Sequence, residues 1–412
     1  MLMDILSHNL LPFLAMIVVL IVVHELGHFI TAKMAGVKVL EFGLGYPPKL
    51  WGVKRGETEY TINALPLGGF VRLLGEEDPG DPRSLAAKPR WVRLVVLSSG
   101  ALMNVVLAIF LFSLALMIPR EVDISRARVG EVVPNSPAEE AGLQPGDIIF
   151  AVDGTDVQSV GELSYQIRLH LGEWVTFRIK PAVTATDRNL PDDGSGFANV
   201  RVYSRWSADN YIDDKGIERP QGPTGITIGP AYGSIEPIPL DEQEEIAKEL
   251  PPGDVVPTTR VRPFSDTQWA WPWEAVPDGA RRSYESLILA RNEIISRIKG
   301  GVGGSGGFQV TGPVGIAQLT GEVVKEAGWK SLMDFAALIS MNLAVLNILP
   351  LPMLDGGRVV FVLLEYVRRG KRVAPHKEAM VHFVGLVAML TLAVVITYFD
   401  VVRLFSGEGI LR

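Results

Sequence analysis

Long apolar runs at both ends of the chain enclose a polar middle, and this contrast is the strongest pattern in the sequence. A helix that crosses a bilayer needs about 20 mostly apolar residues. Four stretches meet that requirement, and we predict transmembrane helices in residues 1–35, 91–119, 331–367 and 379–402. Pro350 and Pro352 interrupt the third. The predicted fold class is therefore a polytopic α-helical membrane protein with four transmembrane helices.

The distribution of basic residues predicts the orientation of these helices, because Lys and Arg concentrate in cytoplasmic loops. The segment between the first two spans, with its flanks, carries Lys33, Lys38, Lys49, Lys54, Arg55, Arg72, Arg83, Lys88, Arg90 and Arg93. The loop after the third span reads RRGKR. We expect both loops in the cytoplasm and the polar middle outside it. The first apolar stretch lacks the basic start of a secretory signal, so we expect it to be retained.

The segments outside the spans differ in pattern. Residues 36–90 contain alternating sequence with Gly and Pro, which predicts short strands and turns. Residues 126–235 predict a compact α+β module, with a helix capped by Ser136, a strand WVTFRIK and a polar insertion at 181–221. We then expect an acidic, Pro-rich linker (236–280), an amphipathic helix (281–300) and a Gly-rich linker with a GPVGI segment (301–330). The amphipathic helix packs on the module or lies on the membrane surface.

Charge and cysteine content narrow the possible chemistry. The net charge of −7 and the absence of a broad basic face argue against nucleic acid as a partner. The chain has no cysteine, so it forms no disulfide and offers no thiolate to a metal. Any bound metal must therefore use His, Asp or Glu.

Residues 24–28 read HELGH, with two histidines four positions apart in the first span. Positions i and i+4 share one face of a helix, so His24 and His28 can reach one metal ion while Glu25 lies beside it. Catalytic zinc takes three protein ligands and leaves a position for water, whose proton Glu25 can accept. The pattern predicts one zinc ion per chain. Ionisable groups inside a membrane are costly and usually functional, which favours this interpretation over a chance match.

Asp355, in the stretch LPMLDGG, is the best candidate for a third ligand. It follows the proline-broken span, where the backbone can turn toward the first span. The alternative is that Asp355 and Gly356 form an ordinary turn, but HELGH favours a ligand. Asn342 and Asn347 in the third span have two interpretations of equal weight. They form hydrogen bonds between helices, or they hold a substrate backbone near the metal.

Several motifs in order along the chain resemble the site-2 protease family of intramembrane zinc metalloproteases, near its bacterial RseP-like branch. They are HELGH, TEYTINALPLGGFVRLLGE, the stretch Gly100–Asn104, GPVGIAQL and NLAVLNILPLPMLDGG. The resemblance implies His24, His28 and Asp355 as zinc ligands and Glu25 as catalytic base. It also implies that Asn342 and Asn347 contact substrate, as do residues of a membrane-associated β-hairpin. These hairpin residues are Gly68, Gly69 and Phe70.

The polar middle resembles a PDZ domain, most clearly in NSPAEEAGLQPGDIIFAVDG. The resemblance implies an extracytoplasmic α+β domain whose peptide groove is lined by Gly225, Ile226, Thr227 and Ile228. The chain departs from the two-PDZ form of this branch, because one GLQPGD-type core is present, and the insertion at 181–221 has no counterpart there.

The resemblance implies a bacterial-type inner-membrane endopeptidase that cuts the transmembrane segments of single-span proteins in the lipid bilayer. Its active site would face the cytoplasmic side, with the PDZ domain filtering substrates such as an anti-sigma factor or a remnant signal peptide. A PDZ peptide ligand is a further expected partner. The alternatives are a non-catalytic PDZ-bearing receptor or scaffold with structural zinc, and a zinc transporter. A structural zinc site is normally closed by four protein ligands, whereas three can be nominated here.

Overall fold

The computed structural model describes residues 10–76, 78–182, 196–207, 210–213, 216, 218–219, 221–250, 255–299 and 312–406. The chain divides into two compact units. The first, which we call the helical unit, comprises residues 1–118, 270–287 and 309–412. The second, the sheet unit, comprises residues 119–269 and 288–308.

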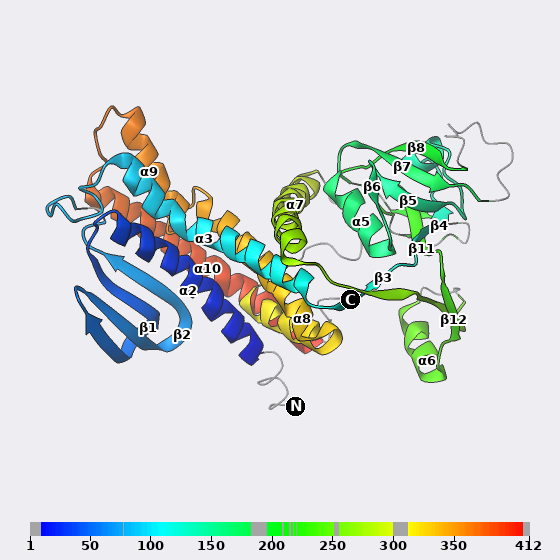
Figure 1. The fold of residues 1–412 in the computed structure, drawn as a ribbon, viewed down its shortest axis with the longest axis horizontal. Coiled ribbons are helices and arrows are strands. Elements are labelled where there is room, and N and C mark those ends of the chain that lie inside the picture. Colours follow the sequence, from blue (N-terminus) through cyan, green and yellow to red (C-terminus); the bar gives the residue numbers. More distant parts are fainter. Residues whose placement is uncertain are drawn as a thin grey trace. The chain divides into compact units, whose positions relative to one another are not determined.

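Four helices in the described residues are long and apolar enough to cross a membrane, as the sequence predicted. They are α2 (Leu11–Met34), α3 (Arg90–Met117), the part of α8 from Gly328 to Ile348, and α10 (Pro375–Ser406) over Pro375–Asp400. Helices α2, α3 and α8 pack against one another in the helical unit (Figure 1). Apolar side chains from these helices fill the contacts between them.

The predicted third span consists of two helices, with the break where Pro350 and Pro352 predicted it. Helix α8 (Pro313–Ile348) changes direction at Gly328, whose φ of +76° lies in the left-handed region that favours glycine. Helix α9 (Asp355–Val367) follows after a short loop. The GPVGI segment, expected in a linker, instead begins α8, and the Gly-rich residues before it lie outside the described residues. The carboxylate of Asp400 in α10 accepts a hydrogen bond from the Gly315 N–H in the first turn of α8.

A small β-sheet lies between α2 and α3 in the sequence. Strands β1 (Val39–Arg55) and β2 (Thr58–Leu73) are long and irregular, and each takes part in more than one pairing. Residues 58–62 lie between residues 51–55 and residues 41–44, while residues 69–73 pair with residues 39–44 on the other side. The segment 69–73 therefore forms one edge of this sheet, and β2 packs on α2.

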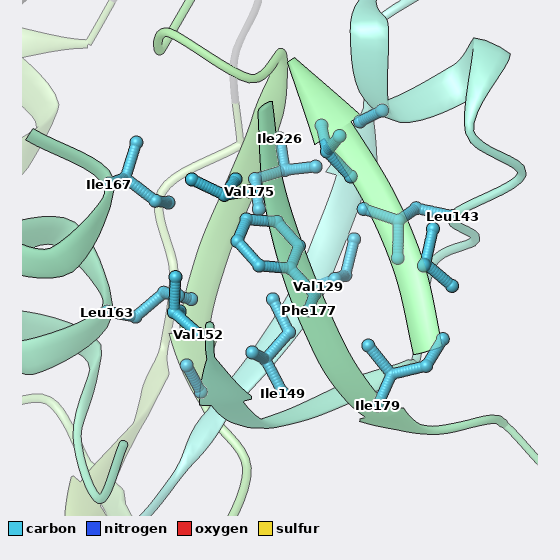
Figure 2. Close-up of a cluster of buried hydrophobic side chains, with 14 of the residues drawn as sticks. Val129, Leu143, Ile149, Val152, Leu163, Ile167, Val175, Phe177, Ile179 and Ile226 are labelled. Carbon is cyan, nitrogen blue, oxygen red and sulfur yellow. The ribbon is translucent and has the colours of Figure 1, made fainter. Parts of the chain in front are cut away.

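The sheet unit is an α+β module built on a six-stranded sheet. Its strand order is β11-β4-β5-β7-β8, with β6 paired to β5. The strands are β4 (Ala127–Val132), β5 (Ile148–Val152), β6 (Thr155–Asp156), β7 (Trp174–Lys180), β8 (Ala198–Tyr203) and β11 (Ile226–Pro230). Alternate residues of the central strands point into one apolar core, in which Phe177 and Ile149 are fully buried (Figure 2). That alternation is what a half-buried strand requires.

Two short helices of the sheet unit begin at serine N-caps. Ser136 precedes α4 (Pro137–Glu140), and its hydroxyl accepts a hydrogen bond from the Glu139 N–H. Ser159 precedes α5 (Val160–Leu169) and accepts in the same way from the Glu162 N–H. Each cap satisfies an N–H that the first helical turn leaves without a partner, which stabilises the helix by about 1 kcal/mol. The cap predicted at Ser136 is confirmed.

The insertion predicted at 181–221 contains a core strand, which corrects that expectation. Strand β8 pairs with β7, and its Ala198, Val200 and Val202 are buried in the main core. The rest of this stretch includes the hairpin β9 (Tyr211–Ile212) and β10 (Glu218–Arg219), while residues 183–195 lie outside the described residues.

The stretch 236–280, expected to be a linker, contains regular structure as well. It holds α6 (Leu240–Glu249), β13 (Thr259–Pro263) and β14 (Ser265–Gln268). Strands β13 and β14 pair with β12 (Gly233–Pro237) and β3 (Arg120–Asp123) respectively. The amphipathic helix expected from residue 281 is α7 (Pro272–Ile298), which starts nine residues earlier, at a proline suited to a first helical turn.

Candidate metal centre

Two helices and a loop bring three potential metal ligands together inside the helical unit. The Nε2 atoms of His24 and His28 in α2 are 3.3 Å apart. Each lies 3.1 Å from Oδ2 of Asp355, the first residue of α9. Both imidazoles are buried. The spacing of four in HELGH places the two rings on one face of α2, whereas the carboxylate comes from a residue 327 positions away from His28.

A glycine of α3 lies directly beside the two imidazole nitrogens. A Cβ built on Gly100 would lie 2.3 Å from His28 Nε2 and 2.6 Å from His24 Nε2. Gly27 of α2 faces the same helix, and a Cβ there would lie 2.4 Å from the Ser99 carbonyl oxygen. The two helices therefore approach closely at these glycines, and the backbone of α3 passes directly beside the two Nε2 atoms.

The loop between α8 and α9 places Asp355. Pro350 and Pro352 end the helical path, and Met353 adopts a positive φ of 80°. A Cβ at Gly356 would lie 2.1 Å from the Leu349 carbonyl oxygen, so glycine lets the start of α9 fold back on the end of α8. The Met353 N–H donates to Nδ1 of His382 in α10 at 2.9 Å, which fixes the loop from a further helix.

The second nitrogen of each imidazole also has neighbours. Nδ1 of His28 donates to the Val96 carbonyl oxygen in α3 at 2.8 Å. Nδ1 of His24 lies 3.4 Å from the side-chain nitrogen of Asn104 in α3 and 3.5 Å from that of Asn347 in α8. Such contacts fix the tautomer and the orientation of a ligating ring. Both rings are thus held on the side away from Asp355.

Glu25 lies against the edge of the small sheet. The backbone N–H of Val71 lies beside its carboxylate. A Cβ on Gly69 would lie 3.4 Å from Glu25 Cγ, so the backbone of the edge segment 69–73 runs past this side chain. Phe70 of the same segment stacks on Tyr46, with ring centroids 6.4 Å apart. The Glu25 carboxylate therefore lies next to both the histidine pair and the edge strand of the small sheet.

The structure brings most, but not all, of the predicted site residues together. His24, His28, Asp355, Glu25 and Asn347 meet at one place. Asn342 lies five positions before Asn347 in α8, about 140° further round the helix at 3.6 residues per turn. Gly68, Gly69 and Phe70 lie in β2, and Gly225, Ile226, Thr227 and Ile228 lie at or in β11 of the sheet unit.

Three residues of α3 near the site were not nominated from the sequence: Val96, Gly100 and Asn104. Gly100 and Asn104 belong to a motif quoted for the family resemblance, but no role was attached to them. Their spacing of four along a predicted helix is the signal that could have found them, because it places all three on one face.

The donor set fits zinc. In a tetrahedral site with bonds of about 2.0–2.1 Å, two ligand atoms are separated by about 3.3 Å. The three ligand–ligand distances here are 3.1, 3.1 and 3.3 Å. Two imidazole nitrogens and one carboxylate oxygen are ligands of the type that catalytic zinc sites use, and Gly100 leaves room where an ion in contact with both Nε2 atoms would lie.

Comparison with known proteins agrees with this chemistry. The model of peptidase family M50 matches residues 12–392. A Clostridium perfringens protein named "Putative zinc metalloprotease CPE1693" is 32% identical, over 93% of this chain and 95% of its own length. The protein named zinc metalloprotease RasP from Oceanobacillus iheyensis is 27% identical, over 96% of this chain and 99% of its own. RasP from Shouchella clausii is also 27% identical, over 97% of this chain and its full length.

The helices, the donor set and these relatives together define the class of the protein, a zinc metalloprotease of a bacterial membrane. The chain belongs to peptidase family M50, the site-2 protease family. The expected enzyme class and zinc cofactor are confirmed. The family therefore favours a protease over the receptor, scaffold and transporter alternatives.

Proposed function

We propose that this protein is an intramembrane endopeptidase that cuts the transmembrane segments of single-span membrane proteins. One observation carries the proposal: the cluster of His24, His28 and Asp355, with Glu25 beside it, lies on or against helices long and apolar enough to span a membrane. A peptide bond that reaches this cluster must itself be at membrane depth. Substrates of that kind are membrane-anchored segments rather than soluble proteins.

In the proposed reaction, His24, His28 and Asp355 hold one zinc ion, which when bound supplies Lewis acidity that polarises the scissile carbonyl. Glu25 accepts a proton from the attacking water and then delivers it to the leaving amide nitrogen. The contact with Val71 holds the Glu25 carboxylate beside the histidine pair before a substrate arrives. The burial of both imidazoles excludes bulk water from their side of the site.

The edge segment of β2 is the proposed docking strand for substrate. A transmembrane helix hides its carbonyl groups in its own hydrogen bonds, so it must unwind before it can be cut. An unwound segment can add as a further strand beside residues 69–73. Gly68 and Gly69 allow close backbone approach there, while Phe70 and the amides of Asn342 and Asn347 contact the substrate. The proximity of Gly69 to Glu25 supports this assignment.

The sheet unit is the proposed substrate filter, a PDZ domain on the extracytoplasmic side. Strand β11 forms an edge of its sheet and lies near α5, the arrangement needed for a peptide to add beside a strand. Gly225, with φ of +80°, precedes Ile226, Thr227 and Ile228 along this edge. A C-terminal peptide is the expected ligand of this groove.

The positive-inside pattern of Lys and Arg supports an active site toward the cytoplasm.

The test is cleavage of a tethered single-span reporter by purified protein in lipid vesicles. The wild-type protein should cut the reporter within its membrane segment, as mapped by mass spectrometry. Glu25→Gln should retain zinc but lose cleavage by at least about 100-fold, the low end of what general base catalysis contributes. Glu140→Gln, an exposed acid of α4, is the matched control and should cut normally. Turnover by Glu25→Gln at the wild-type rate, or cuts confined to soluble regions, would contradict the proposal.

A further inference from the structure

One face of α3 carries a contact to each imidazole of the candidate metal centre. The Val96 carbonyl oxygen accepts from Nδ1 of His28, and Asn104 lies beside Nδ1 of His24. Gly100, midway between them, leaves the gap in front of both Nε2 atoms. His24 lies beside Asn104 and His28 beside Val96, so the two helices run antiparallel here. Positions spaced by four on α3 thus match positions spaced by four on α2.

The two imidazoles require the same kind of partner. A histidine that binds a metal through Nε2 carries its proton on Nδ1, and that N–H needs an acceptor. His28 has one in the Val96 carbonyl oxygen at 2.8 Å. For His24, the side-chain contacts near Nδ1 are two carboxamides, those of Asn104 and Asn347, and each presents its nitrogen. One of the two must turn its oxygen toward the ring to accept the proton.

Asn104 is the carboxamide with an oxygen to offer. It is completely buried, and its Oδ1 has no hydrogen-bond partner within the described part of the chain. Leaving a buried acceptor without a partner is costly. Half a turn of the carboxamide about its last bond exchanges oxygen and nitrogen with almost no change in shape. After this rotation the Asn104 oxygen accepts the Nδ1–H of His24, and both groups have a partner. Asn347, by contrast, is only partly buried.

We propose that Asn104 is a positioning residue whose side-chain oxygen accepts the Nδ1–H of His24 and so holds Nε2 toward the metal. The Ser340 hydroxyl donates to the Asn104 main-chain carbonyl oxygen at 2.8 Å, which ties this point of α3 to α8. The inference rests on the proposed role of His24 as a zinc ligand. It assigns the hydrogen bonds at Nδ1 of both imidazoles to α3 and leaves Asn347 available for substrate.

The test is the zinc affinity of purified full-length protein in detergent, measured by competition with a chromophoric chelator. Asn104→Leu keeps the volume but removes the acceptor, and it should weaken zinc binding by about 10- to 100-fold. Asn104→Asp keeps an acceptor oxygen and should bind zinc at least as tightly as the wild type. Asn347→Ala removes the other carboxamide near His24, so it tests which of the two accepts the proton, and its zinc affinity should be unchanged. Leu102→Ala, at an exposed position of α3, is the control outside the site.

Three results would overturn the inference. Unchanged affinity in Asn104→Leu would mean that the oxygen plays no part. Equal losses in Asn104→Leu and Asn104→Asp would mean that only packing matters at this position. A loss in Asn347→Ala alone would assign the contact to α8 instead. Absence of zinc from the wild-type protein would count against the proposed metal site itself, so the two failures are distinguishable.

Discussion

At the scale of single residues, the site depends on three ligand atoms that come close together because glycines let the surrounding backbone segments approach. HELGH was enough to predict that His24 and His28 share a helix face, because that relation is local. Asp355 was nominated because an acid follows a broken span in a chain with HELGH, and because the family resemblance implies it. The glycine in front of the cluster, Gly100, was not nominated, because its role depends on which helix packs against α2, and periodicity does not contain that information.

The gap at Gly100 gives a sharp prediction. In Gly100→Ala the added methyl group would lie within 2.6 Å of both Nε2 atoms, closer than van der Waals contact allows. We expect zinc content, measured by atomic emission on purified protein, to fall from one per chain to less than about a tenth of that, since the methyl group excludes a ligand position.

The control for this variant is Leu102→Ala, which alters an exposed side chain two positions along α3. It should keep its zinc. Full zinc content in Gly100→Ala, with the wild-type fold retained, would show that the metal does not lie between α2 and α3.

At the scale of elements, the loop that joins α8 to α9 decides whether the third donor reaches the other two. The sequence predicted the break at Pro350 and Pro352, because proline cannot continue a helix. The sequence did not predict which residue hydrogen-bonds to the loop. His382 comes from α10, and its contact with the Met353 N–H depends on how a separate helix packs, which no local pattern records.

The hydrogen bond from Met353 to His382 should therefore support metal binding from a distance. His382→Phe removes the acceptor but keeps a ring next to Phe361, with which His382 now packs. We expect zinc affinity to fall by up to about tenfold, because a hydrogen bond of this kind contributes about 0.5–1.5 kcal/mol. Chelator competition measures the change.

Phe383→Leu is the comparison for that variant, since Phe383 neighbours His382 in α10 but is exposed. Its zinc affinity should equal that of the wild type. If His382→Phe binds zinc as tightly as Phe383→Leu does, the loop is held in place without this hydrogen bond.

At the scale of the whole molecule, the chain consists of two units with separate cores. The contrast between apolar ends and a polar middle predicted this division, because apolar runs of about 20 residues and short alternating strands are distinct signals. Strand β8 was missed because residues 181–221 are polar overall, and its alternating sequence FANVRVY is short. Only its pairing with β7 identifies it as part of the core.

Because the cores are separate, damage to one unit should spare the other. Phe177→Ala opens a cavity among the fully buried residues of the sheet unit (Figure 2), and we expect that unit to lose about 3–5 kcal/mol of stability. The protein should still bind one zinc ion. Denaturant unfolding followed by limited proteolysis measures the first effect, and metal analysis measures the second.

Lys180→Ala, at an exposed position of the same strand, should leave both properties unchanged. Loss of zinc in Phe177→Ala would mean that the metal centre depends on the sheet unit, contrary to the division described above.

The most direct test of the account is to locate the zinc ion by anomalous X-ray diffraction at the zinc absorption edge, using crystals of the full-length protein. The account predicts one anomalous peak per chain, about 2.0–2.2 Å from Nε2 of His24, Nε2 of His28 and a carboxylate oxygen of Asp355. A peak bound by other residues, or zinc-replete crystals with no peak between these three side chains, would contradict it.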